Sequence, residues 1–250
     1  MPENTGSLNE ILDRGLASAG IDIDPQANGQ LLDFLNLLKK WNRVYNLTAV
    51  RNQDDMVGYH IIDSLALLAS LPRRSMVPEI NGQVSESEEE IISGDNMKTG
   101  EGVDMDPHRD SITADILDIG SGAGLPVFPL AIVRPDLHFL SVESNGKKTR
   151  FQQQVMLELG LQNVTVMQDR IESVTALVQQ VTSRAFIAPA SFLEIAAKHC
   201  IRGGSAVVML GHADRLPENL PVPFQLESIR PVINPLVEGL RHIAVCLISD

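Results

Sequence analysis

Short apolar segments alternate with segments of helical periodicity through the second half of the chain. The apolar segments span residues 116–119, 138–143, 164–168, 181–183 and 206–210, and helical segments span 126–133, 146–159 and 189–199. Strands that alternate with helices form parallel sheets covered by helices on both faces. We therefore predict an α/β fold with a mainly parallel, doubly wound sheet.

The two flanks of this region have different patterns. Residues 224–232 and 240–248 read as two further strands joined by a loop, which predicts an antiparallel closing pair at one edge of the sheet. Before residue 72, apolar residues recur at helical spacing from Leu8 to Leu16, from Leu31 to Trp41 and from Ile61 to Leu68. We expect an N-terminal helical extension there.

A strongly acidic stretch separates the two parts. Residues 78–111 hold ten acidic and two basic side chains, so that −8 of the net charge of −12 is local to them. The stretch is rich in Ser and Gly and has little apolar periodicity, which is typical of a disordered insertion. We divide the chain into an N-terminal helical region (1–72), an acidic insertion (73–113) and an α/β domain (114–250). Because the acidity is local, it does not exclude a nucleic-acid partner.

A glycine-rich turn follows the first predicted strand. Gly120, Gly122 and Gly124 allow the backbone to turn tightly and to approach a ligand, and open sheets of this type bind ligands at the carboxyl ends of their strands. Glu143 ends the second predicted strand, where a carboxylate can accept hydrogen bonds from two ribose hydroxyls. A turn and an acid without a ligand remain the alternative, but their register favours a nucleotide-type cofactor.

The spacing of the glycines narrows the choice of cofactor. The motif is Gly-x-Gly-x-Gly, with Leu125 breaking the Gly-x-Gly-x-x-Gly pattern of dinucleotide enzymes, and the turn lacks the Lys and Ser/Thr of an ATP-binding loop. This favours S-adenosylmethionine. Two cysteines, Cys200 and Cys246, lack the spacing of metal ligands and are expected to be buried thiols, so we predict no metal.

The chain resembles the bacterial 16S rRNA guanine-N7 methyltransferases, the glucose-inhibited division protein B family. The resemblance rests on segments in family order: KWNRVYNLT (40–48), HIIDS (60–64), DIGSGAGLP (118–126), GKKTRF (146–151), RIE (170–172), SRAF (183–186) and RH (241–242). It implies a class I S-adenosylmethionine-dependent methyltransferase fold and methylation of N7 of one guanine in 16S rRNA.

The resemblance also implies residue roles. Gly120, Gly122, Gly124 and Leu125 line the cofactor and Glu143 holds its ribose, while Ile171 and Glu172 lie at its adenine end. Arg184 lies between the cofactor and the target base, Arg241 approaches the guanine, and the two form the catalytic pair. Lys147, Lys148 and Arg150 are expected to face RNA phosphate, although cations near a helix start are also common on solvated surfaces.

This chain departs from the family pattern at four places. Val127 replaces a glycine, Leu210 precedes Gly211 where a Lys is usual, Tyr59 replaces a basic residue, and a Lys is lost near Leu247. Another RNA, a protein or a small molecule therefore remains an alternative substrate, and a cofactor-binding ribosome-assembly module remains an alternative to an enzyme. We expect a cytoplasmic monomer that binds 16S rRNA or the 30S particle and no membrane.

Overall fold

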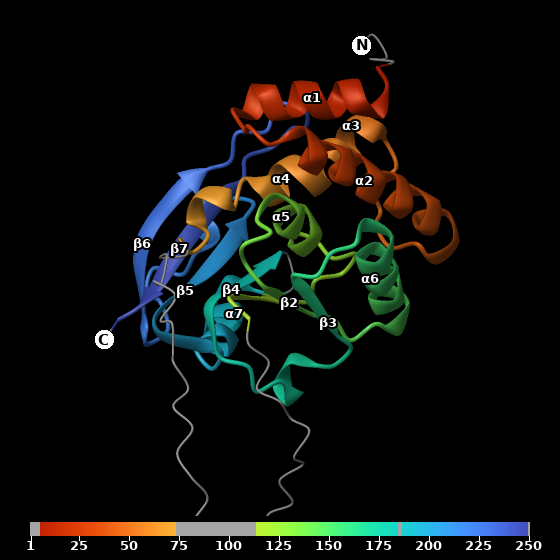
Figure 1. The fold of residues 1–250 in the computed structure, drawn as a ribbon. Helices are drawn as coiled ribbons and strands as arrows, with labels where there is room; N and C mark the ends of the chain where they lie inside the picture. The colour runs from red at the N-terminus through yellow and green to blue at the C-terminus, as the bar shows by residue number, and fades with distance from the viewer. Residues whose placement is uncertain (1–5, 74–113, 185–186, 250) are drawn as a thin grey trace, which may run out of the picture.

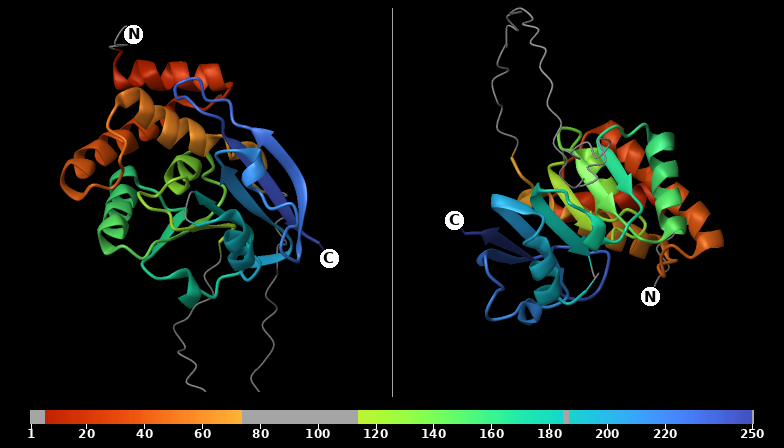
Figure 2. Two further views of the ribbon diagram at one scale, coloured as in Figure 1. Left: turned by 180° about the vertical axis from the view of Figure 1, so that it is seen from behind. Right: turned by 90° about the horizontal axis from the view of Figure 1, so that it is seen from below.

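The structure is a computed structural model and describes residues 6–73, 114–184 and 187–249 (Figure 1). Nearly all of the acidic insertion predicted at 73–113 lies outside the described residues, as do two residues of the SRAF segment. Helices α1–α4 lie together on one side of the molecule, next to α5 and α6 (Figure 1 and Figure 2).

One seven-stranded sheet forms the centre of the molecule. Its strands are β1 (Ile116–Ile119), β2 (Phe139–Val142), β3 (Val164–Met167), β4 (Val178–Arg184), β5 (Cys200–Leu210), β6 (Phe224–Pro231) and β7 (His242–Ile248). They are ordered β3-β2-β1-β4-β5-β7-β6. The first five pair in parallel, whereas β7 runs antiparallel to both β5 and β6. The predicted doubly wound sheet with an antiparallel closing pair is confirmed.

The interior strand β1 is buried along its whole length because both faces of the sheet are covered. Ile116 belongs to a hydrophobic cluster shared with the N-terminal helices, α5 and α6. Leu117 and Ile119, which point to the opposite face, belong to a second cluster that includes α7. The N-terminal helices therefore complete the core on one face of the sheet.

Helices and short helical turns connect the strands. They are α1 (Leu8–Ala19), α2 (Pro25–Tyr45), α3 (Gln53–Met56), η1 (Val57–Ile62), α4 (Asp63–Leu65), η2 (Leu68–Ser70), α5 (Val127–Val133), α6 (Gly146–Leu159), η3 (Ile171–Ser173), α7 (Pro189–Ala196) and η4 (Ala213–Arg215). Local sequence sets several ends. Ser7 and Glu10 form a reciprocal capping box on α1, and Asp24 caps α2, which begins with Pro25.

The third predicted N-terminal helix is a composite. Gln53 to Leu65 runs as α3, then the π-helix η1, then α4. Apolar periodicity identifies a helix but does not reveal a π-turn, which depends on tertiary contacts and occurs often at functional sites. The predicted strands at 181–183 and 206–210 begin earlier in the structure, as β4 and β5, because the polar residues and glycines at 179–180 and 202–205 interrupt the apolar signal before each predicted segment.

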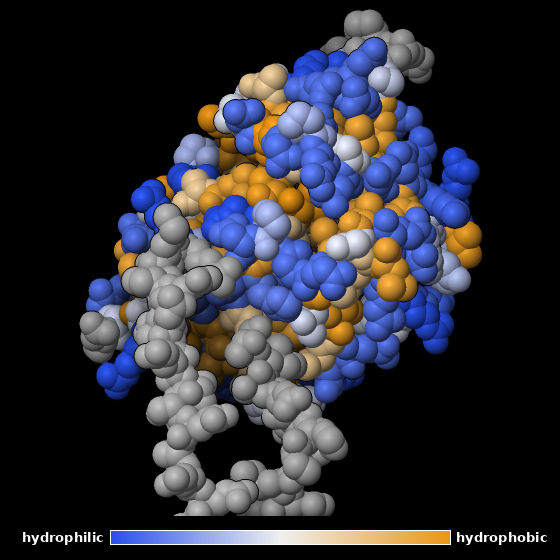
Figure 3. Space-filling model, viewed as in Figure 1, coloured by the Kyte–Doolittle hydropathy of each residue, from blue (hydrophilic) through white to orange (hydrophobic). Residues whose placement is uncertain are grey.

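The surface in Figure 3 shows several separate hydrophobic patches among hydrophilic residues. Within the described part of the chain, no helix combines the length and apolar character that a membrane crossing requires. The same residues contain no group of three or more His, Cys, Asp or Glu side chains arranged to hold a metal ion.

Candidate active site

The glycine-rich turn after β1 has the backbone conformation that its sequence predicts. Gly120, Gly122 and Gly124 all have positive φ, at 72°, 60° and 75°. A side chain at Gly124 would also collide with the ring of Phe128 on α5. The absence of a side chain at Gly124 therefore lets α5 pack closely against the turn. Gly120 and Gly122 face the cleft at the ends of the strands.

Glu143 follows β2 and is joined to the glycine turn. Its carboxylate accepts hydrogen bonds from the backbone N–H groups of Gly122 and Asn145, each at 2.8 Å, and the Lys148 ammonium lies 4.0 Å away. Each carboxylate oxygen accepts one of these bonds and keeps a further lone pair. Glu143 can therefore hold the turn and still accept hydrogen bonds from two ligand hydroxyls.

A cleft of about 520 Å³ opens at the carboxyl ends of the parallel strands. It is lined by Leu47, Thr48, Ile119, Gly120, Ser121, Gly122, Ala123, Leu125, Val142, Glu143, Ser144, Lys148, Asp169, Arg170, Ile171, Glu172 and Arg184. Its walls combine apolar side chains with a carboxylate at a strand end. This donor and acceptor set fits a nucleoside-type ligand: Glu143 for ribose hydroxyls, and Leu125 and Ile171 for the faces of a base.

Arg184 ends β4 and closes one side of the cleft. Its guanidinium donates a hydrogen bond to the backbone carbonyl of Tyr59 in η1, so the N-terminal helices hold it. Burial lowers the pKa of Arg184, and the nearby carboxylates of Asp63 and Asp118 act in the opposite direction. The guanidinium stays charged, because an arginine side chain does not lose its proton in proteins.

Arg241 directly precedes β7 and is held by the N-terminal helical segment that also holds Arg184. Its Nε atom is 2.8 Å from the Asp63 carboxylate, and its guanidinium carbon lies 4.9 Å from the centre of the Tyr59 ring. It also donates to the backbone carbonyls of Gly239 and Glu238. Arg241 is therefore anchored beside η1 and does not line the cleft itself.

Two further buried polar side chains lie near Arg184. His60 is 3.2 Å from the Thr48 hydroxyl, and burial together with the charge of Arg184 lowers its pKa to about 3. Burial raises the pKa of Asp118, in β1, to about 7. At neutral pH His60 is therefore uncharged, and Asp118 is near the midpoint of its titration.

Sequence comparison decides what kind of protein this cleft belongs to. The family whose description is rRNA small subunit methyltransferase G matches residues 27–78 and 101–220. The chain belongs to this family. The internal stretch between the two matched parts, 79–100, falls inside the acidic segment.

Curated relatives carry the same description over nearly the whole chain. Ribosomal RNA small subunit methyltransferase G from Neisseria meningitidis is 34% identical over 243 residues, covering 94% of this chain and 96% of the relative. The protein of the same name from Aromatoleum aromaticum is 35% identical over 242 residues, with 94% and 96% covered. Among solved structures, TrmN from Thermus thermophilus matches with a TM-score of 0.47 and 17% identity, covering 54% of this chain and 44% of that one.

The methyltransferase brings most of its predicted site residues to one cleft. Six of the predicted cofactor residues and Arg184 line it: Gly120, Gly122, Leu125, Glu143, Ile171, Glu172 and Arg184. Gly124 lies outside the lining, where it packs against α5. Lys148 lines the cleft beside Glu143, whereas Lys147 and Arg150 lie exposed on α6.

Other cleft residues were not singled out from the sequence. Leu47 and Thr48 reach the cleft from the N-terminal region, and Asp169 and Arg170 come from the loop after β3. Leu47 and Thr48 belong to the KWNRVYNLT segment, but the sequence of this segment does not indicate that it reaches the cleft at the ends of the strands. Asp63 and Tyr59 are the partners of the two arginines. The sequence gives no indication of this role beyond their place in or beside the HIIDS segment.

The departures from the family pattern have identifiable surroundings. Tyr59 places an aromatic ring, where the family has a basic residue, against the Arg241 guanidinium. Val127 is buried at the start of α5 and belongs to the core. Leu247 lies on β7 between Ser205 and Gln225 of the neighbouring strands. These residues pack within the fold, and Tyr59 contacts a predicted site residue.

Proposed function

We propose that this chain transfers a methyl group from S-adenosylmethionine to N7 of one guanine in the 16S rRNA of the small ribosomal subunit. The observation that carries the proposal is the hydrogen bond between the glycine turn and Glu143, in a cleft that Arg184 also lines and in a chain of the rRNA small subunit methyltransferase G family. Sequence relatives over most of the chain support rRNA as the substrate.

The residues of the cleft fit the proposed cofactor. Glu143 accepts the ribose hydroxyls, and Ile171 with Leu125 packs against the adenine. When bound, S-adenosylmethionine supplies a methyl group on a sulfonium centre. Gly120 and Gly122 line the cleft without side chains, so a bound ligand could approach their backbone closely.

The proposed acceptor atom needs no proton transfer. Guanine N7 carries a lone pair and no proton, so the protein has to place N7 in line with the methyl group and to exclude water. Methylation leaves a positive charge on the guanine, and an arginine does not stabilise that charge. We assign Arg184 and Arg241 to orientation of the base and its backbone, through donation to guanine O6 or to a phosphate.

A methyl-transfer assay tests the proposal. Tritiated S-adenosylmethionine is incubated with the chain and with 16S rRNA or 30S particles from cells that lack their own N7 methyltransferase. We expect one labelled guanine, and no label on particles from cells that already carry the modification. Cofactor binding without transfer to any RNA would support the assembly-module alternative, and label at another base would change the assigned substrate.

The form of the substrate and the assembly of the protein belong to the same proposal. Comparing naked rRNA with 30S particles in this assay identifies the preferred partner. We propose that the chain acts as a monomer in the cytoplasm, where its substrate is found. Light scattering of the purified protein tests the first point, and fractionation of cells tests the second.

A further inference from the structure

The end of α2 forms a rigid corner between residues 42 and 51. Asn46 ends the helix with a φ of 50°, in the left-handed region that residues other than glycine rarely adopt. The Asn42 side chain accepts a hydrogen bond from the backbone of Thr48 at 2.9 Å. Arg51 donates to the Asn42 carbonyl and, at 2.9 Å, to the Asn46 side chain. These bonds fix the conformation of the corner.

The corner turns its residues in two directions. Leu47 and Thr48 point into the cleft and form part of its wall. Two side chains at the end of α2 face solvent instead, with Val44 70% and Tyr45 44% exposed. Consecutive Cα atoms are 3.8 Å apart, so the Cα atoms of Tyr45 and Leu47 are separated by at most about 7.6 Å. The backbone of Tyr45 is therefore close to the wall of the cleft, although Tyr45 itself does not line it.

The Tyr45 ring is supported from one side by other aromatic rings. Its centre lies 5.2 Å from that of Trp41, at an interplanar angle of 33°. Trp41 in turn lies 5.7 Å from Phe151 on α6. The stack joins the end of α2 to α6 and leaves the Tyr45 ring partly exposed, an arrangement that holds an aromatic surface in place with little loss of entropy on binding.

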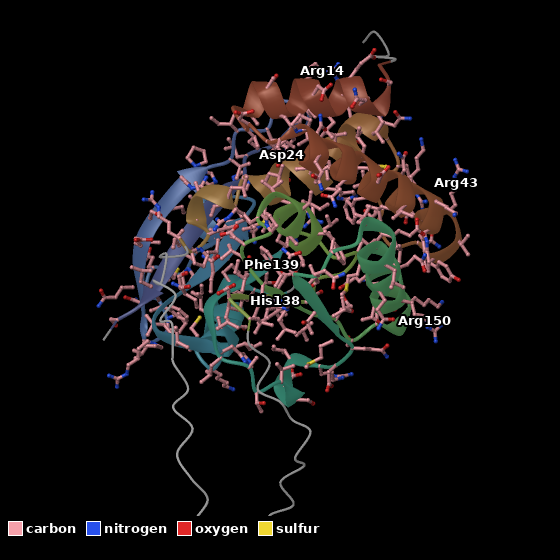
Figure 4. All side chains as sticks on the ribbon, viewed as in Figure 1. Arg14, Asp24, Arg43, His138, Phe139 and Arg150 are labelled. Atoms are coloured by element: carbon pink, nitrogen blue, oxygen red, sulfur yellow. The ribbon has the colours of Figure 1, made fainter. Side chains whose placement is uncertain are left out.

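Three exposed basic side chains lie on the same two helices as these aromatic rings. Arg43 is exposed near the end of α2, and Lys147 and Arg150 are exposed on the first turns of α6. Among the residues that the structure describes, none of the three has a carboxylate partner. Figure 4 shows Arg43 and Arg150 along the same edge of the molecule, in a chain whose overall charge is −12.

We propose that Tyr45 is a stacking platform for an unpaired base of the RNA next to the target guanine, with Arg43, Lys147 and Arg150 binding the adjacent phosphates. An aromatic ring beside cations is the arrangement that binds single-stranded nucleic acid. In a double helix the base faces are already stacked, so the platform selects an unpaired segment. This inference rests on the proposed function, because it takes rRNA as the partner.

The experiment compares Tyr45→Phe, Tyr45→Leu and Tyr45→Ala with the original chain, using an unmodified 16S rRNA transcript. The Phe variant keeps a ring, and the Leu variant keeps apolar contact with Trp41 without one. We expect the KM for rRNA to rise about tenfold in the Leu and Ala variants and to stay within twofold in the Phe variant. S-adenosylmethionine affinity and kcat should stay within twofold in all three.

A second measurement reports on the stack directly. Trp41 is the single tryptophan of the chain, and its emission should fall on RNA binding in the original chain and the Phe variant and change less in the Leu variant. Leu157→Ala is the matched control, because Leu157 is 78% exposed on α6 about 16 Å along the helix from Gly146. This control should behave like the original chain in both measurements.

Two results would count against the inference. An unchanged rRNA KM and unchanged rRNA affinity in Tyr45→Leu would show an apolar contact, as a protein partner makes, in place of base stacking. An equally large increase in the KM for rRNA in Leu157→Ala would show that the effect is not specific to the Tyr45 ring. If the original chain does not methylate rRNA, the proposed function is overturned instead. The affinities of the Tyr45→Phe and Tyr45→Leu variants for the rRNA transcript then decide by themselves whether Tyr45 stacks on a base.

Discussion

The Arg241 guanidinium lies 2.8 Å from the Asp63 carboxylate, which joins the start of β7 to the N-terminal helices. Asp63 also accepts a hydrogen bond from the Asn234 side chain at 2.6 Å. Both charged groups are nearly buried, with side-chain exposures of 14% for Arg241 and 5% for Asp63. The pair therefore positions an arginine to which the proposed function assigns the orientation of the RNA base. It also fastens the loop before β7 to the N-terminal helices.

The two halves of this pair are expected to differ in their effect on stability. Asp63→Ala leaves a nearly buried cation without a carboxylate, and we expect a cost of about 3–5 kcal/mol in the free energy of unfolding. Arg241→Ala should cost less, about 1–3 kcal/mol, because Asp63 keeps its Asn234 bond and burial raises its pKa, which eases protonation. Urea unfolding measures both.

Asp54→Ala, in the more exposed pair with Arg14, is the control and should cost under about 1 kcal/mol. Equal losses in the two Asp63–Arg241 variants would contradict this asymmetry.

Arg241 and Arg184 should also separate in activity assays. Arg184 lines the cleft, so Arg184→Ala should weaken both S-adenosylmethionine binding and methyl transfer. Arg241 does not line it, so Arg241→Ala should lose most transfer to 16S rRNA while cofactor affinity stays within a few-fold. Calorimetry and single-turnover assays at a temperature where both variants are folded make the comparison. Full turnover in Arg241→Ala would restrict Arg241 to its structural pairing with Asp63.

Glu143→Ala should weaken S-adenosylmethionine binding by about 1–3 kcal/mol, because it removes the acceptor for two hydroxyls. It also releases the backbone N–H groups of Gly122 and Asn145, so the melting temperature should fall as well. Glu143→Gln keeps the size of the side chain and separates the two effects, since its amide oxygen still accepts one hydrogen bond. Calorimetry that shows unchanged cofactor affinity in both variants would remove Glu143 from the cofactor site.

The three basic residues on α6 are expected to have two different roles. Lys148 lines the cleft 4.0 Å from Glu143, so Lys148→Ala should change cofactor affinity. Lys147 and Arg150 are exposed, so their Ala variants should weaken rRNA binding and lower the slope of log K against log salt by about 1 each. Binding titrations at several salt concentrations check this. An unchanged slope in both exposed variants would leave them as ordinary surface charges.

His60 and Asp118 should give opposite pH dependences of stability. The folded protein keeps His60 neutral down to about pH 3, whereas the unfolded chain protonates it below about pH 6.5, so its contribution falls as the pH drops. The folded protein keeps a proton on Asp118 up to about pH 7, whereas the unfolded chain loses it above about pH 3.9, so its contribution falls as the pH rises. Between about pH 4 and pH 6.5 the two contributions oppose each other.

Removing either group should expose the other. Asp118→Asn is expected to make the free energy of unfolding rise more steeply with pH in this window than in the original chain, by about 1 kcal/mol per pH unit. His60→Asn should shift the slope by a similar amount in the opposite direction. Denaturant unfolding at about pH 4, 5 and 6 measures both slopes. Slopes that match the original chain in both variants would show that neither group changes its protonation on folding.

The sequence by itself determined the order and type of most elements and the position of the cofactor turn. Periodicity of 2 and 3.6 residues, the glycines at 120, 122 and 124, and an acid at the end of the next strand are local signals, and parallel strands bring their carboxyl ends to one edge. The helix from Gly146 to Leu159 and the strand from Ile116 to Ile119 accordingly have the predicted bounds.

Tertiary structure alone decided which distant residues hold the two arginines and which side chains of the KWNRVYNLT segment reach the cleft. The backbone carbonyl of Tyr59 and the Asp63 carboxylate come from the N-terminal helical segments, and the arginines that they hold lie far away in sequence. Thr48 reaches the cleft from the segment that follows α2. The same holds for the pKa values of His60 and Asp118, since burial by elements distant in the chain is their largest cause. Local patterns carry no information about such contacts, because they depend on the packing of the complete core.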